Sequence, residues 1–227
     1  LNTGDTPVDS DNGLITTIAI NLDGKTSYAL EGSVFVAGAA VQWLRDEMGL
    51  VKSAAETEEV ARSIPDSGNV FVVPAFTGLG APYWDMYGRG TILGLTRGTG
   101  RAHVVRATLE SIAYQTRDVL DAMALDSGLK PTVLRVDGGA SANNFLMQFQ
   151  ADILGSQVIR PAVIETTAMG VAMLAGRAVG LWNDRQLAGL WKSARAFDPT
   201  MEQAERERLY RLWQRAVERA KGWAQEL

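Results

Sequence analysis

RVDGGASANNFLMQF, residues 135–149, is the stretch of the sequence that decides the fold class. A β-type run ends at Asp137, two glycines follow, and an apolar helical pattern begins behind Asn143 and Asn144. Strands followed directly by helices form layers, because each helix buries its apolar stripe against a sheet. The stretch therefore predicts an α/β fold with a mixed or parallel sheet flanked by helices.

The rest of the chain continues this alternation of strands and helices. Apolar, β-branched runs predict strands at residues 14–20, 27–30, 70–74, 133–136 and 157–160. Apolar residues at helical spacing predict helices at residues 33–48, 53–63, 101–127, 142–154, 166–179 and 201–227. The helix at 166–179 is largely Ala, Gly and Met, so its backbone can approach another element closely. The aromatic, Gly- and Pro-rich segment 76–89 predicts an irregular loop, and we expect one domain.

Composition excludes several classes of function. The 227 residues are 46% hydrophobic and carry a net charge of −4 without a basic block, which argues against nucleic acid as the main partner. The absence of Cys excludes disulfides and thiolate metal sites and fits a reducing compartment, so we expect a cytoplasmic protein. No apolar run reaches the roughly 18 residues of a membrane span, so none is expected.

The glycine corner in residues 135–149 is the first candidate site. Ligands of α/β proteins bind outside the carboxyl ends of strands, and Gly138 and Gly139 would let a phosphate or sugar lie against the backbone. A helix beginning near residue 142 would point its free N–H groups there, with Asn143 on its first turn offering amide donors and an acceptor. These features suit a nucleotide. The alternative is an ordinary Gly-Gly turn in which Asn143 only caps the helix, since neither GxGxxG nor GxxxxGK[ST] occurs.

A second segment, LEGSVFVAGAAVQWL at residues 30–44, also combines bare backbone with an amide. Gly38 and Gln42 are four residues apart, as are Gly139 and Asn143, so each pair would lie on one helical face. Two such helices could form opposite walls of a slot for adenosine. The alternative for Gln42 is an ordinary surface residue.

Longer stretches of the sequence resemble a known family. VVPAFTGLGAPYWDMYGRGTILGLTRGT, HVVRATLESIAYQTRDVLDAM and YALEGSVFVAGAAVQWLRDEMGL, together with residues 135–155, are similar to the glycerol kinases among the FGGY carbohydrate kinases. The resemblance implies an actin-like, ribonuclease H-like ATPase fold of two domains with a cleft between them. It also implies transfer of phosphate from ATP to glycerol with Mg²⁺, giving sn-glycerol 3-phosphate, and a homo-oligomer (dimer or tetramer). Carried over by position, the nucleotide contacts fall on Gly38, Gln42, Gly139 and Asn143.

The sequence departs from the family pattern in one respect. The glycerol-binding residues and the aspartate proposed as general base lie in the family's N-terminal part, in a GDQ-type segment before a YGTG-type strand, and neither segment occurs here. The resemblance therefore implies that residues 1–227 are the C-terminal, nucleotide-binding domain without its first strand or two. We expect no catalytic residue and no metal ligand set in this chain, and no turnover from it alone.

Some alternatives remain open at the level of the sequence. The chain could belong to another FGGY kinase acting on a polyol or ketose, or to a non-catalytic actin-like nucleotide-binding module. Asp137 could approach Mg²⁺ or a phosphate-bound water, cap the next helix, or pair with Arg135. Asp85 is expected to fix its own loop, and His103, the sole histidine, to cap a helix or lie at the surface.

Overall fold

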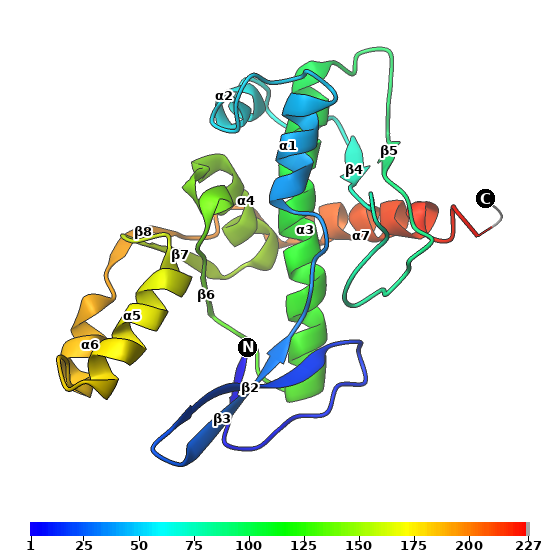
Figure 1. Cartoon of the computed structure of the whole chain (residues 1–227). Helices are drawn as coiled ribbons and strands as arrows, with labels where there is room; N and C mark the ends of the chain where they lie inside the picture. The colour runs from blue at the N-terminus through cyan, green and yellow to red at the C-terminus, as the bar shows by residue number, and fades with distance from the viewer. Residues whose placement is uncertain (226–227) are drawn as a thin grey trace.

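The computed structural model describes residues 1–225, and these form alternating strands and helices (Figure 1). The strands are β1 (Asn2–Gly4), β2 (Ile15–Leu22), β3 (Lys25–Glu31), β4 (Phe71–Val73), β5 (Thr91–Leu93), β6 (Val133–Arg135), β7 (Gln157–Pro161) and β8 (Ser193–Phe197). The helices are α1 (Gly38–Asp46), α2 (Glu56–Arg62), α3 (Arg101–Ser127), α4 (Asn144–Leu154), α5 (Thr166–Ala178), α6 (Asp184–Leu190) and α7 (Gln203–Ala220), with the 3₁₀ helix η1 (Gly139–Ala142) before α4.

The strands form three small sheets rather than one. The first has the order β1-β3-β2 and is antiparallel, and β4 pairs with β5 in a second antiparallel sheet. The third has the order β6-β7-β8: β6 and β7 run parallel, with Leu134 opposite Val158, and β8 is antiparallel to β7. The prediction of an α/β fold with a mixed sheet and flanking helices is confirmed.

Helix α3 is the axis of the molecule, as Figure 1 shows, and its predicted bounds are confirmed. It begins behind Gly100, where His103 Nδ1 accepts the Gly100 N–H at 3.1 Å, so the capping role of His103 is also confirmed. It ends at Gly128, whose φ of 69° is the left-handed conformation that glycine adopts without steric cost. α1, α2 and α4 pack against this helix.

The main core lies where α3, α4, α7 and β4 meet. Tyr114 stacks on Trp213 with ring centroids 5.2 Å apart and contacts Phe149 edge-on at 5.4 Å. Trp213 is completely buried. Asp118 lies beneath these rings and accepts hydrogen bonds from Tyr210 Oη at 2.7 Å and Trp213 Nε1 at 2.8 Å.

The predicted helix at residues 33–48 is shorter than expected, because α1 begins only at Gly38. The carbonyls that would open a longer helix are bonded elsewhere. Ser33 O accepts the Ala81 N–H at 2.9 Å, and Val36 O accepts from Gln115 Nε2 at 3.2 Å. Residues 33–36 are therefore held as an irregular segment between loop 76–89 and α3, and Gly38 becomes the first residue of α1.

Loop 76–89 is irregular, as predicted, and Asp85 organises it. Its Oδ1 accepts the N–H groups of Tyr87 at 2.8 Å and Gly88 at 3.1 Å. Its Oδ2 accepts the Gly222 N–H at 2.7 Å, beyond the end of α7. The expectation that Asp85 fixes its loop is confirmed.

The later part of the chain differs from expectation in three places. α6 and β8 were not predicted. α7 ends at Ala220 instead of continuing through residue 225, and the last two residues of that predicted helix lie outside the described part. Of the two glycines of α5, Gly176 lies close to the Trp182 ring and Gly170 faces open space, while Val171 and Leu174 are exposed. Among residues 1–225, no helix has the length and apolarity needed to cross a bilayer.

Candidate functional site

A cavity of about 500 Å³ opens between α1, α2 and the junction of η1 with α4. All four predicted site residues line it: Gly38, Gln42, Gly139 and Asn143. Its apolar floor is formed by Val41, Leu109 and Leu146. The two segments that carry the predicted residues are about 100 positions apart in the sequence, so their convergence is a tertiary feature.

The two glycines leave open space on the cavity wall. A Cβ atom built on Gly38 or Gly139 would meet no atom within 4 Å, so packing within the protein does not require glycine at either position. Both face a cavity whose contents would approach their backbone directly. Gly138 differs, because its φ of 76° lies in the region that side chains disfavour.

Asn143 occupies a different position from the one predicted. It is the N-cap of α4, with extended backbone, rather than a first-turn residue, and Gly139 belongs to the preceding 3₁₀ turn. The pair Gly139–Asn143 therefore does not share one α-helical face as Gly38–Gln42 does. Asn143 Oδ1 accepts the Leu146 N–H at 3.0 Å, the usual cap bond, and its Nδ2 donates to Thr57 Oγ1 at 3.1 Å.

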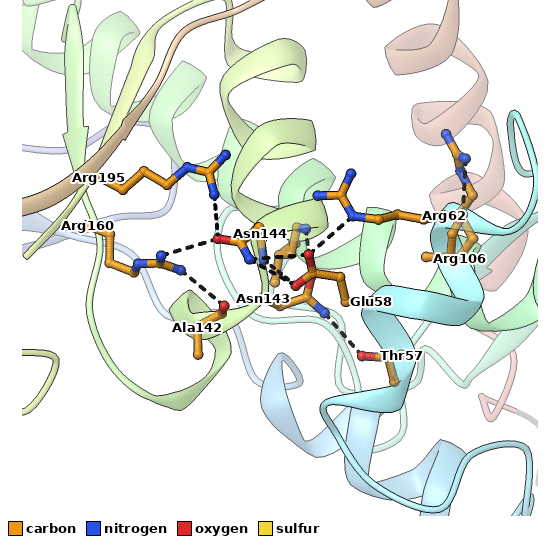
Figure 2. A network of polar contacts seen from close by, with 11 residues as sticks. Thr57, Glu58, Arg62, Arg106, Ala142, Asn143, Asn144, Arg160 and Arg195 are labelled. Atoms are coloured by element: carbon orange, nitrogen blue, oxygen red, sulfur yellow. Dashed lines mark hydrogen bonds and ion pairs between the residues drawn. The ribbon is translucent and has the colours of Figure 1, made fainter.

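The third wall of the cavity is α2, a helix that was predicted but was not connected with the candidate site. Thr57, Val60 and Ala61 of α2 are buried, and Thr57 and Glu58 line the cavity. Figure 2 shows Glu58 reaching from α2 to the start of α4. Its Oε2 accepts the Asn144 N–H at 2.8 Å, and Asn144 Nδ2 donates to Oε1 at 3.2 Å.

These contacts correct the expectation that the start of α4 offers free N–H groups. The Asn144 N–H is bonded to Glu58 and the Leu146 N–H to the cap Asn143. A carboxylate already occupies the position where a helix N-terminus would receive an anion. A phosphate group beside Glu58 would meet a carboxylate of the same charge sign, so this helix end suits an uncharged part of a ligand better.

The Glu58 carboxylate is held in its charged form. Burial raises its pKa, but hydrogen bonds from the Asn144 N–H, the Asn144 amide and Arg62 outweigh burial and hold the pKa below its usual value. On the far side, Asn144 Oδ1 accepts from Arg160 at 3.2 Å and Arg195 at 3.1 Å (Figure 2). The start of α4 is thus fixed from both sides.

Asp137 is not part of this cavity. Its carboxylate accepts the hydroxyl of Thr166, the first residue of α5. The Arg135 guanidinium lies 4.5 Å from the centre of the Trp191 ring. Asp137 therefore contacts the start of α5, whereas the next helix, α4, is capped by Asn143, so the expectation that Asp137 caps the next helix is not met.

The site therefore has two chemically different ends. The end near Gly38 and Gly139 presents open backbone, while the end near Thr57, Glu58 and Asn143 presents oriented polar groups above an apolar floor. Such an arrangement can hold a flat heterocycle by apolar contact and edge hydrogen bonds, with a polyanionic tail beside the glycines. Among the described residues, no group of three or more acidic, His or Cys side chains is arranged to hold a metal ion.

Comparison with known proteins gives the family. The sequence pattern of the FGGY family of carbohydrate kinases, C-terminal domain, matches residues 1–179. The chain belongs to this family. Among its relatives, the glycerol kinase of Petrotoga mobilis is 65% identical to this chain over 227 residues. Glycerol kinase 2 of Thermotoga maritima is 62% identical to it over 224 residues. The chain spans 46% and 45% of these proteins, respectively.

Solved structures agree with this assignment. One match is the crystal structure of Plasmodium falciparum glycerol kinase with ADP. Its TM-score is 0.89 and its sequence identity is 38%, and the match covers 97% of this chain and 44% of that one. A xylulose kinase from Lactobacillus acidophilus matches with a TM-score of 0.80 and 24% identity, over 93% and 43% of the two chains, which shows a shared fold. The predicted actin-like kinase fold is confirmed.

Proposed function

We propose that this chain supplies the ATP half-site of a glycerol kinase, an enzyme that transfers phosphate from ATP to glycerol and yields sn-glycerol 3-phosphate. The observation that carries the proposal is the convergence of Gly38, Gln42, Gly139 and Asn143 on one cavity. The 60–65% identity to several glycerol kinases supports glycerol as the acceptor. We propose further that residues 1–227 act as the C-terminal nucleotide-binding domain of a cytoplasmic homo-oligomer.

The different chemistry of the two ends of the cavity supports one orientation of the nucleotide in this proposal. The phosphates and the sugar lie along Gly38 and Gly139, where no side chain intrudes. The adenine ring lies over the apolar floor with its polar edge toward Gln42 and Asn143. The charge on Glu58 supports this direction, because a carboxylate repels phosphate and accepts hydrogen bonds from a base.

Magnesium enters the proposal as part of the substrate, MgATP. Mg²⁺ is commonly held by substrate phosphates with only one or two protein carboxylates. Phosphoryl transfer relies on positioning and electrostatic stabilisation, so this chain's part is to hold and orient the nucleotide. The glycerol pocket and the general base belong, in this proposal, to a different part of the enzyme.

The steric test of the half-site is Gly38→Ala in the full-length protein. The new methyl group meets no protein atom, so stability should be unchanged or slightly raised. It would instead occupy the space assigned to the nucleotide, and we expect ADP affinity to fall at least about tenfold, as for a clash at a close backbone contact. Isothermal titration calorimetry with MgADP measures this change.

Gly170→Ala is the matched control. Gly170 also lies in a helix with no atom within 4 Å of an added Cβ, but it belongs to α5, outside the cavity. We expect it to leave ADP affinity unchanged, and both variants should retain glycerol affinity. Equal ADP affinity of wild type and Gly38→Ala would refute the proposed half-site.

The second candidate function is phosphorylation of a different polyol or a sugar. It is favoured by the matches to a xylulose kinase and to a gluconate kinase, both from Lactobacillus acidophilus. A coupled assay of ADP release with glycerol, xylulose and gluconate as acceptors separates these functions. Turnover with glycerol at least about 100-fold more efficient than with the others is the expected result.

A further inference from the structure

Thr57 lines the cavity from α2 and connects this helix to the cap of α4. The residue is only 1% exposed, so neighbouring atoms cover almost all of its surface. Its Oγ1 donates to Ala54 O at 2.5 Å and accepts from Asn143 Nδ2 at 3.1 Å. These two bonds form a short chain from the α2 backbone to the Asn143 amide.

The donor and acceptor in each of these hydrogen bonds are fixed. A threonine hydroxyl carries one proton, and here that proton is used on Ala54 O, so toward Asn143 the hydroxyl can only accept. On the other side, the Leu146 N–H can only donate to Asn143. The amide of Asn143 is therefore fixed with nitrogen toward α2 and oxygen toward α4. A flipped amide would place oxygen against oxygen and N–H against N–H.

We propose that Thr57 is a positioning residue that orients the Asn143 amide and thereby sets the preference of the site for one purine base. This inference rests on the proposed nucleotide half-site and adds to it the origin of base selectivity. Each end of the Asn143 amide keeps one unused hydrogen-bonding position: the second N–H of Nδ2 and the second lone pair of Oδ1.

The remaining donor and acceptor match the edge of adenine. An Asn amide pairs with adenine by accepting from N6 and donating to a ring nitrogen. In guanine an acceptor, O6, takes the place of the N6 amino group, and it would face the fixed Oδ1. A firmly fixed amide therefore favours adenine, and an amide that is held less firmly loses part of its contact with adenine.

The principal test uses Thr57→Val in the full-length protein, because valine keeps the shape and removes the acceptor. We expect ADP affinity to fall about tenfold, the usual loss for a buried hydrogen bond left unpaired, with GDP affinity changed less than about twofold. The ADP-to-GDP affinity ratio should fall accordingly, and Thr57→Ser, which restores the hydroxyl, should return it to within about twofold of wild type. Calorimetric titrations with each nucleotide provide the ratio.

Thr108→Val is the matched control. Thr108 is also fully buried in a helix, donates its hydroxyl to Val104 O at 2.8 Å, and does not line the cavity. It should lose thermal stability in a similar way while keeping the ADP-to-GDP ratio. If Thr57→Val does not fold, Thr57→Cys replaces it, because a thiol is a weak acceptor of similar size.

A double-mutant cycle with Asn143→Ala tests whether Thr57 acts through the amide. In that background Thr57→Val should change ADP affinity by less than about twofold. An equal loss in both backgrounds, or an unchanged ADP-to-GDP ratio in Thr57→Val, overturns the role of Thr57 and leaves the half-site intact. A wild-type protein that binds neither nucleotide refutes the half-site itself.

Discussion

The carboxylates of Asp118 and Glu58 each accept several hydrogen bonds, but the groups that donate to them are of different kinds. Asp118, in the core, is 4% exposed and accepts from the neutral Tyr210 and Trp213 side chains. Burial raises its pKa from 3.8 to about 6, since neutral donors only partly offset the loss of water. Glu58, at the site, is half-buried and accepts from a helix N-terminus and from Arg62, and its pKa is lowered.

The comparison separates hydrogen bonds that stabilise the core, around Asp118, from hydrogen bonds that order the wall of the cavity, around Glu58. The Asp118 contacts lie in the core, because Tyr210 and Trp213 belong to α7 and all three side chains are buried. The Glu58 contacts lie beside a cavity and order the helix end that forms its wall. We expect changes at Asp118 to alter stability strongly, and changes around Glu58 to alter stability less and the site more.

The largest effect is expected from Asp118→Ala. It leaves the Tyr210 hydroxyl and the Trp213 N–H buried without an acceptor, so the free energy of unfolding should fall by about 2–4 kcal/mol. Urea denaturation at pH 7 measures the loss. Asp121→Ala is the control, since this carboxylate is 53% exposed and 3.4 Å from Arg117, and it should cost less than about 0.5 kcal/mol. Similar losses for both variants would contradict the comparison.

The next effect concerns the pH dependence of stability. A carboxyl whose folded pKa is about 6 binds its proton more tightly in the native state than in the unfolded chain. Its contribution is fully present below about pH 4 and is lost as pH rises through 6, by about 3 kcal/mol in total. Asp118→Asn lacks this titration, so the stability of wild type minus that of the variant should decrease between pH 4 and 6. A flat difference curve would show that Asp118 is not protonated at pH 5.

Glu58→Gln should show the opposite slope and the smallest effect. A lowered folded pKa gives stability that is present above the unfolded value and is lost as pH falls through the folded value. We expect about 0.5–1 kcal/mol at pH 7, typical of a charge at a helix N-terminus, and almost none at pH 3. Urea titrations at the two pH values measure it. Glu59→Gln, on the exposed neighbour, serves as the control, and equal losses for the two variants would count against the role of Glu58.

Local signals in the sequence were sufficient for much of the fold. The bounds of α3 follow from its continuous apolar stripe and from Gly128, because both the stripe and the left-handed cap are properties of neighbouring residues. The start of α1 was wrong because Ser33 and Val36 give their carbonyls to loop 76–89 and α3, contacts that no local pattern encodes. β8 escaped prediction because its residues are largely exposed and lack the apolar alternation of a half-buried strand.

Part of the site was also predictable from local signals in the sequence. Two pairs stand out locally as bare backbone followed four residues later by an amide: Gly38 with Gln42, and Gly139 with Asn143. Their meeting in one cavity depends on how α1 and α4 pack around α3. Thr57 and Glu58 were missed, because α2 carries the charged residues typical of a surface helix and their partners are 86 residues away. The single usable hint was the buried-type pattern of Thr57, Val60 and Ala61 on one face of that helix.

Asp85 has a consequence for how the molecule would be attacked by proteases. It joins loop 76–89 to Gly222, and the Ala224 N–H adds a bond to Tyr87 O at 2.9 Å. Asp85 and Gly222, which are 137 positions apart in the sequence, thus hold the loop and the segment behind α7 together. We therefore expect cleavage within the loop by an endoprotease to become faster when the segment behind α7 is detached from it.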